Sequence, residues 1–203
     1  MEKHFPGFAQ GYFQDHSRKI VLGADGVPRT EYVYEGIYYI PEGTAADWRR
    51  QKLLTLLFVS SAAAMLLWAM LTPADLNRLT DILLLQVLGL FLLLALGFGV
   101  FNRLTSSRRM TRWEYRMSVL TVKECSLLLA LCVGMAVLDG LIRLTLSSVV
   151  STPAELAALA KLTGSAAAAW LSWRQICTER YTREQSDDLP SGTDITNDFN
   201  PMP

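Results

Sequence analysis

The sequence predicts an all-α integral membrane protein, a bundle of four transmembrane helices with a small N-terminal cytoplasmic β-hairpin element. Of the 203 residues, 51% are hydrophobic, and most of them lie in four long runs. A helix needs roughly 20 such residues to cross a hydrocarbon core about 30 Å thick. Lysine and arginine gather at alternate ends of the runs, which is typical of a multi-pass membrane protein.

Residues 1–50 are predicted to form a cytoplasmic region that contains the hairpin. RKIVL and TEYVYEGIYYI are rich in β-branched and aromatic residues, and GADGVPR between them supplies turn residues. We expect Gly36 to mark a bulge in the second strand. A lone hairpin is marginal in water, so it must pack on a neighbouring connection, the bilayer, a second copy or a partner. No cleavable signal peptide is expected, because the first residues are aromatic and polar.

The four-helix membrane domain is predicted over residues 51–180. Its helices are expected at about 51–71, 73–102, 123–148 and 153–174. The fourth run is alanine-rich and therefore only weakly apolar on insertion scales. An interfacial helix or a buried soluble helix is the alternative for that run.

Two similar motifs precede the second and fourth helices. LTPADL begins at Leu71 and STPAEL begins at Ser151, and each places a threonine before a proline and a carboxylate two residues after it. The hydroxyl can cap the first turn, and the carboxylate can reach back as in a capping box. The similarity fits a duplicated helical hairpin. It also fits two turns that converged on the same capping chemistry.

The positions of the basic residues predict the orientation. They precede the first helix, crowd the connection 103–122 and follow the fourth helix, whereas the first connection carries only Arg78 and the third carries none. Cytoplasmic loops retain lysine and arginine. Both termini are therefore predicted to be cytoplasmic, in a bacterial cytoplasmic membrane.

The connection 103–122 is predicted to be a basic amphipathic helix on the inner leaflet. Its arginines would form a membrane-surface patch, made of Arg108, Arg109, Arg112 and Arg116. Each basic residue near anionic lipid contributes about 1 kcal/mol of attraction. Alternatively, these arginines only enforce the orientation of the chain. Residues 181–203 are polar and punctuated by proline, and are predicted to be a disordered cytoplasmic tail.

Three charged residues interrupt the last two apolar runs: Asp139, Arg143 and Lys161. An intramembrane charge costs at least ~2.5–3.5 kcal/mol on insertion scales, so each is expected to have a partner. Asp139 lies about 13 Å of helix from the outer end of its run, and Lys161 lies about 12 Å into the next. We predict that these two residues pair across the helix interface, with Arg143 one turn from Asp139. The cluster would either hold helix register or bind a proton, an ion or an anionic solute.

A seam of small and mildly polar residues is predicted to join the third and fourth helices. Its expected members recur at helical spacing, and are Cys125, Cys132, Ala136 and Gly140 on one helix and Gly164, Ser165, Ala168 and Ser172 on the other. Small residues let helices approach closely, and hydroxyls can bond across the interface.

The sequence predicts no enzyme. No nucleotide-binding loop, nucleophile constellation or metal-type spacing of its 3 cysteines and 2 histidines is present, so no catalytic residue, cofactor, metal or nucleic acid is expected. The predicted function is a non-enzymatic accessory or scaffold subunit of a membrane assembly, with lipid and either a protein partner or a homo-oligomer. The alternative is a small transporter or channel-forming oligomer that uses Asp139, Arg143 and Lys161.

Overall fold

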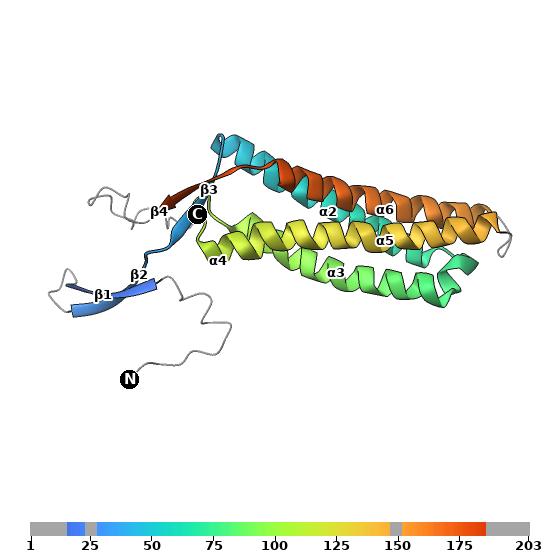
Figure 1. Ribbon diagram of the computed structural model, residues 1–203, viewed down its shortest axis with the longest axis horizontal. Coiled ribbons are helices and arrows are strands. Elements are labelled where there is room, and N and C mark those ends of the chain that lie inside the picture. The colour runs from blue at the N-terminus through green and yellow to red at the C-terminus, as the bar shows by residue number, and fades with distance from the viewer. Residues whose placement is uncertain (1–15, 23–27, 147–151, 186–203) are drawn as a thin grey trace, which may run out of the picture.

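The computed structural model describes residues 16–22, 28–146 and 152–185. Four long helices lie side by side in an elongated bundle, and the strands lie at one end of it, called here the β end (Figure 1). The opposite end is called the far end. The long helices are α2 (Ala45–Leu71), α3 (Thr80–Thr105), α5 (Thr121–Thr145) and α6 (Pro153–Thr178).

Short elements connect these helices or lie at the β end. The helical ones are η1 (Asp75–Arg78), α4 (Arg112–Tyr115) and the π-helical turn η2 (Arg116–Leu120). The strands are β1 (His16–Leu22), β2 (Pro28–Tyr34), β3 (Ile37–Pro41) and β4 (Tyr181–Gln185).

Three helical segments are long and apolar enough to cross a membrane. They are Ala45–Leu71, Thr80–Thr105 and the continuous segment Arg112–Thr145, which joins α4, η2 and α5. Helix α6 has a similar length but is not among them. Alanine contributes less to hydropathy than leucine does, and α6 is rich in alanine.

Helix α2 begins at Ala45, six residues before the predicted start at residue 51. The cause is a capping box that the sequence analysis missed: the Thr44 hydroxyl accepts from the Asp47 amide at 3.2 Å, and the Asp47 carboxylate accepts from the Thr44 amide at 2.9 Å. These bonds satisfy amides that lack a partner within the helix, so the polar turn before the apolar run is helical too. Gly43, just ahead of the cap, has φ +99°, a backbone conformation that glycine adopts without strain.

The predicted start of the second helix at residue 73 is wrong. The turn η1 occupies residues 75–78, and α3 begins only at Thr80. Thr72 ends α2 instead of capping α3, and its hydroxyl donates to the Trp68 carbonyl at 2.8 Å. In the other motif Thr152 does cap α6, because its hydroxyl accepts from the Glu155 amide at 3.3 Å. The third helix ends at Thr145 and the fourth at Thr178.

The connection 103–122 is only partly the predicted amphipathic helix. Helix α3 continues through Thr105, and residues 106–111 are not helical. The basic helical segment begins at Arg112 and continues through η2 into α5.

The N-terminal strands differ from the predicted hairpin. β1 and β2 pair in antiparallel register, with His16 opposite Tyr34. Residues 23–27 of the predicted turn lie outside the described residues, and its last two residues, Pro28 and Arg29, belong to β2. The predicted second strand divides at Gly36, which separates β2 from β3 and is not a bulge within one strand. β3 pairs with β4, so residues 181–185 of the predicted disordered tail form a strand. Residues 186–203 lie outside the described part.

β3 also joins the connection after α3. The Tyr39 amide donates to the Met110 carbonyl at 2.8 Å, and the Met110 amide donates to the Tyr39 carbonyl at 3.0 Å. Met110 is fully buried. The β3–β4 sheet therefore links three segments that lie far apart in the sequence, and we call β3, β4 and Met110 the platform.

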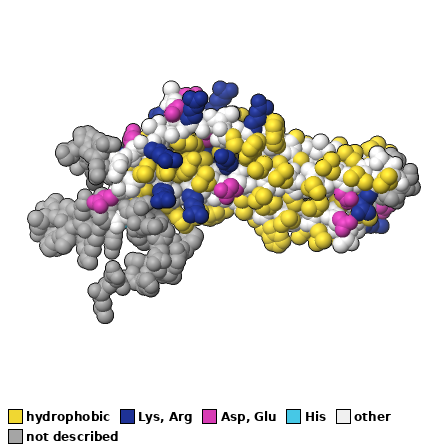
Figure 2. Space-filling view, in the orientation of Figure 1, with side chains coloured by type: hydrophobic (Ala, Val, Ile, Leu, Met, Phe, Trp, Pro, Cys, Tyr) yellow, Lys and Arg dark blue, Asp and Glu magenta, His cyan; other side chains and the backbone are white. Residues whose placement is uncertain are grey.

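The bundle packs apolar side chains between its helices and also exposes many of them. Buried core residues come from all four long helices and include Leu66, Leu96, Leu129 and Leu162. Leu71, Phe91 and Leu94 are at least 65% exposed. Figure 2 shows hydrophobic side chains over the middle of the bundle and charged side chains toward its ends. This distribution is that of a membrane-associated helix bundle.

Candidate functional site

The structure separates the three predicted intramembrane charges. Arg143 Nε donates to Asp139 Oδ2 at 2.9 Å, as expected for an i,i+4 pair. The same guanidinium reaches Asp81 of α3, with Nη2 2.7 Å from Oδ2. Lys161 lies elsewhere: its Nζ donates to the Thr72 hydroxyl at 2.7 Å and lies 4.4 Å from the centre of the Trp68 ring.

The predicted pair between Asp139 and Lys161 is therefore wrong. Gly140 faces α6, because a Cβ added there would lie 2.6 Å from Leu159. Its neighbour Asp139 is turned aside from that contact. Lys161 shares a face with Ser165, whose hydroxyl donates to the Ala62 carbonyl of α2 at 2.9 Å. Equal depth in the bundle did not bring the two charges together, because they lie on different helix faces.

The predicted small-residue seam is distributed over three helix interfaces. The hydroxyls of Ser126 and Ser172 are 3.2 Å apart between α5 and α6. Ser165 contacts α2, and the Cys132 thiol contacts the Leu85 carbonyl of α3 at 3.2 Å. Small polar residues thus bond across every major contact of the bundle.

Glu155 caps a turn of another helix connection. Its carboxylate accepts from the backbone amides of Asp75 at 2.6 Å and Leu76 at 3.2 Å. Glu155 is buried, and these charge-assisted bonds satisfy the first amides of η1. The acid of STPAEL therefore binds the LTPADL segment directly, and the two similar motifs contact each other at the far end.

A buried cluster of charged and aromatic side chains lies at the β end. We call it the junction cluster, and its members are Trp48, Arg103, Glu179 and Tyr181. Arg103 is fully buried, and its Nη2 lies 2.5 and 2.6 Å from the two carboxylate oxygens of Glu179. The Tyr181 hydroxyl donates to the same carboxylate at 2.6 Å, and the Trp48 ring centre lies 4.9 Å from Arg103 Cζ. The cluster joins α2, α3, the end of α6 and β4.

The electrostatics of the junction cluster keep its phenol protonated. Burial raises the pKa of Tyr181 well above its usual range, with Arg103 opposing the shift and Glu179 adding to it. Tyr181 therefore acts as a hydrogen-bond donor to Glu179 throughout the physiological pH range.

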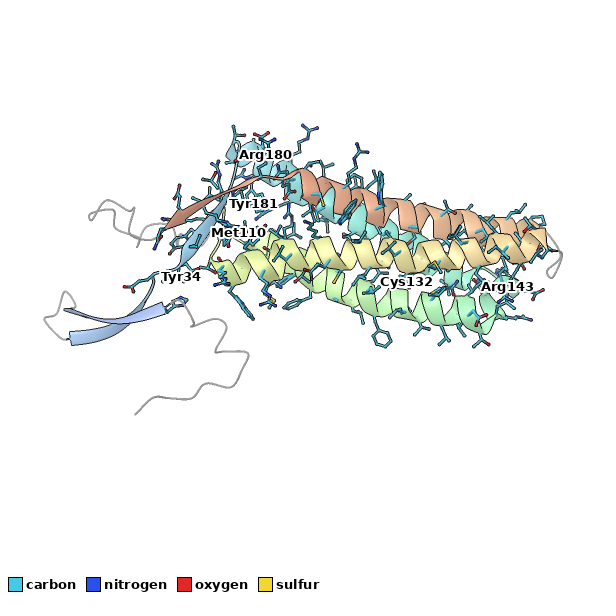
Figure 3. All side chains as sticks on the ribbon, viewed as in Figure 1. Tyr34, Met110, Cys132, Arg143, Arg180 and Tyr181 are labelled. Atoms are coloured by element: carbon cyan, nitrogen blue, oxygen red, sulfur yellow. The ribbon has the colours of Figure 1, made fainter. Side chains whose placement is uncertain are left out.

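An aromatic layer continues from the cluster into the platform. The rings of Tyr39 and Tyr115 are stacked with centres 4.3 Å apart, and Tyr115 meets Tyr181 edge-on at 5.0 Å. Nearby, Lys52 donates to the carbonyls of Leu104 at 3.0 Å and Ser106 at 2.6 Å, which satisfies the end of α3. Figure 3 shows Tyr181 and Met110 at the β end and Arg143 near the opposite end.

The junction cluster was not predicted from the sequence. Arg103 was counted among the basic residues that set orientation, and Glu179 had no recognised pattern. One signal was available: Arg103 falls in the last turn of a long apolar helix, where a buried guanidinium requires an acidic partner. The identity of that partner depended on the packing of α6 beside α3.

The predicted membrane-surface patch is divided. Arg108 donates to the Gly43 carbonyl, while Arg109 lies 4.1 Å from the centre of the Tyr38 ring and 3.9 Å from Glu184. Burial raises the pKa of Tyr38, partly offset by Arg109. Arg112 and Arg116 point outward and are exposed. The first two arginines therefore hold the β end together, whereas Arg112 and Arg116 form an exposed basic surface.

The described residues contain no group of three or more histidine, cysteine or acidic side chains placed to hold a metal ion. The polar contacts of the bundle are structural. Buried ion pairs, helix caps and interhelical hydrogen bonds set the relative positions of the helices and strands. No protein-family model, curated protein or solved structure matches the chain.

Proposed function

We propose that this protein spans a bacterial cytoplasmic membrane four times and serves as a non-enzymatic accessory or scaffold subunit of a membrane assembly. The proposal for four spans is supported by the position of α6. This helix packs along α2 and α5, both of which belong to segments able to cross a membrane. Its serines bond to those neighbours within the bundle. A helix held at the same depth as two spanning helices spans with them.

The orientation is supported by the distribution of charge between the two ends. Exposed arginines at the β end include Arg49, Arg50, Arg112 and Arg116. At the far end Arg78 pairs with Asp75 and Arg143 pairs with Asp81. Segments rich in lysine and arginine favour the cytoplasmic side, which supports a cytoplasmic β end and cytoplasmic termini. Arg112 and Arg116 then face anionic lipid of the inner leaflet.

The observation that carries the scaffold role is the junction cluster beneath the platform. It fixes strands from both the N-terminal region and the segment after α6 onto the ends of membrane helices. An accessory subunit needs such a rigid cytoplasmic surface for a partner. The charges at Asp139, Arg143 and Lys161 support a structural role, because each is bound within the bundle and the three do not converge.

Purification from native membranes in mild detergent, with quantitative mass spectrometry, tests this proposal. We expect a heterologous partner at fixed stoichiometry. The variant Thr182→Ala with Glu184→Arg, on the exposed strand β4, should lose the partner, whereas Arg78→Ala at the far end should retain it. A pure homo-oligomer that catalyses solute flux in proteoliposomes, and loses flux in Lys161→Met, would instead establish the transporter alternative.

A further inference from the structure

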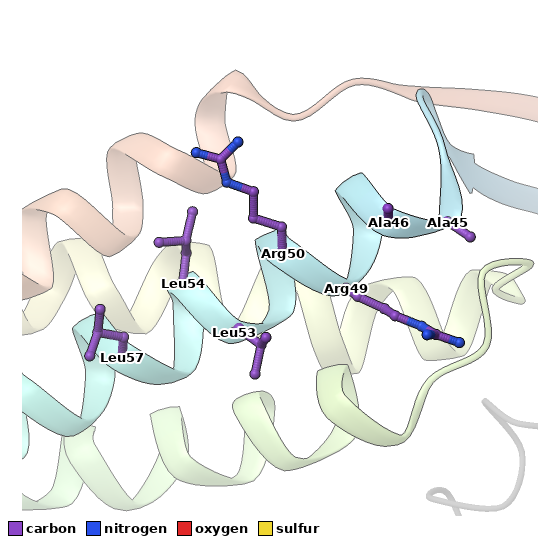
Figure 4. A pocket seen from close by; sticks show the side chains of 7 residues that line it. All are labelled: Ala45, Ala46, Arg49, Arg50, Leu53, Leu54 and Leu57. Carbon is purple, nitrogen blue, oxygen red and sulfur yellow. The ribbon is translucent and has the colours of Figure 1, made fainter.

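An open groove runs along the outer face of α2 at the β end of the bundle. Its volume is about 720 Å³. Figure 4 shows the side chains that line it, and all of them come from the first part of α2: Ala45, Ala46, Arg49, Arg50, Leu53, Leu54 and Leu57.

The groove is lined by arginines at one end and by leucines along its length. Positions 46, 50, 53 and 57 are separated by 4, 3 and 4 residues and therefore share one face of the helix. Leu53 and Leu57 are 63% and 58% exposed. Arg49 and Arg50 lie directly before this leucine stripe, about two turns into α2.

In the part of the chain that the structure describes, the guanidiniums of the two arginines are not held by other side chains, although Arg50 attracts the nearby Asp47 carboxylate. Within the described residues neither Arg49 nor Arg50 forms an ion pair or a hydrogen bond through its side chain. The nearby cations differ: Lys52 is bound to two carbonyls, and Arg103 is bound to Glu179.

We propose that this groove is a specific seat for an anionic phospholipid. The phosphate binds the guanidinium of Arg50, Arg49 adds its charge from the neighbouring side of the helix, and an acyl chain lies along Leu53 and Leu57 (Figure 4). A guanidinium matches a phosphate through charge-assisted, bidentate hydrogen bonds. The leucines belong to a segment able to cross a membrane, so the arginine turn stands at headgroup level. The inference rests on the proposed insertion of α2 and is independent of the scaffold role.

Native mass spectrometry of the delipidated protein in detergent tests the seat. Phosphatidylglycerol and phosphatidylcholine with identical acyl chains are titrated separately. The variant Arg49→Gln with Arg50→Gln should bind the first phosphatidylglycerol roughly tenfold more weakly or worse, from about 1 kcal/mol for each arginine. The matched control Arg112→Gln with Arg116→Gln removes the same charge from exposed positions at the same end and should lose clearly less affinity for this first lipid, because neither arginine lines the groove.

Two further arms identify the bound molecule as a lipid. Leu53→Ala with Leu57→Ala should weaken phosphatidylglycerol binding while all charges remain, because the acyl chain loses apolar contact. Free glycerol phosphate should not displace the lipid. Arg50→Lys should retain more affinity for phosphatidylglycerol than Arg50→Gln does. These two single variants replace the double variant in the comparison if the double variant unfolds at a lower temperature than the parent.

The proposal is overturned by any of three results. They are equal affinity for the two lipids, equal losses in the two arginine double variants, and displacement by glycerol phosphate. The measurement uses purified protein without any partner, so its failure leaves the scaffold proposal standing, and loss of the partner in native membranes leaves the lipid seat standing.

Discussion

Among the described residues, Arg103 is the largest side chain that is fully buried. Its ion pair with Glu179 is as deeply buried, with the two side chains 0% and 3% exposed. A buried charge without its partner is costly, whereas replacement of both partners by neutral groups is tolerated far better. The pair therefore specifies where the segment after α6 sits against the end of α3.

Glu179→Gln is expected to destabilise the protein by about 3–5 kcal/mol, because Arg103 is left buried without a counter-charge. The double variant Arg103→Met with Glu179→Gln should cost clearly less than the sum of the single variants. Thermal and denaturant unfolding in one detergent would measure the cycle. The exposed pair Arg78 and Asp75 is the matched control, with expected coupling of about 0–1 kcal/mol. Additive costs at Arg103 and Glu179 would disprove the specifying role.

At the far end, Asp139 is expected to couple to Arg143 and not to Lys161. Asp139→Asn and Arg143→Met should show a coupling of roughly 0.5–1 kcal/mol, since the pair is only partly buried. Asp139→Asn and Lys161→Met should be additive, because Lys161 binds Thr72 instead. Unfolding of the single and double variants measures both cycles. Strong coupling between Asp139 and Lys161 would contradict the structure.

At the scale of elements, helix contacts depend on a few close approaches. α3 meets α5 at Gly99, where an added Cβ would lie 2.9 Å from a methyl of Val122 and 3.3 Å from its backbone nitrogen. A β-branched side chain and a backbone atom cannot easily move aside. The same helix carries Gly97, whose added Cβ would meet nothing within 4 Å.

Gly99→Ala is therefore expected to destabilise the contact between α3 and α5 by about 1–3 kcal/mol through overpacking. Gly97→Ala should be neutral or slightly stabilising, because alanine favours the helix and open space surrounds it. Melting temperatures of the two variants in the same detergent provide the comparison. Equal effects would show that the contact at Gly99 does not limit packing.

At the scale of the whole molecule, the two ends of the bundle are closed in different ways. The β end is fixed by the junction cluster and the platform. The far end is fixed by Glu155 on η1 and by Arg143 between Asp81 and Asp139. A cysteine introduced to test the orientation in the membrane must be exposed and must not replace a residue of these buried contacts. The contacts at the two ends therefore limit the positions that can be used.

Single cysteines in a background with Cys125, Cys132 and Cys177 replaced by serine should report the proposed orientation. Arg78→Cys, at a side chain 84% exposed, should react with an impermeant thiol reagent added outside intact cells. Ser107→Cys, exposed at the β end, should react only after the membrane is opened. Labelling of Ser107→Cys from outside would show that the orientation is the opposite of the proposed one, or that the number of spans is odd.

Local sequence was enough to predict the apolar runs, the helical character of the chain and the cap at Thr152, because these depend on neighbours within one or two turns. The spacing of four residues between Asp139 and Arg143 also allowed the pair that forms, although the predicted partner of Asp139 was Lys161. The capping box at Thr44 could have been found in the same way. These features need no knowledge of how the helices pack.

Only the tertiary structure decided which faces meet. Lys161 and Asp139 lie at similar depth, yet rotation of their helices gives them different partners. Glu155 caps η1 from 80 positions away, counted to Asp75, and β3 pairs with β4 across most of the chain. A strand edge or a buried carboxylate forms hydrogen bonds with the donor that tertiary packing places beside it. The hydrophobic periodicity of the sequence does not specify which donor that is. The physical reason is that contacts between remote segments depend on helix rotation and crossing, which no local pattern contains.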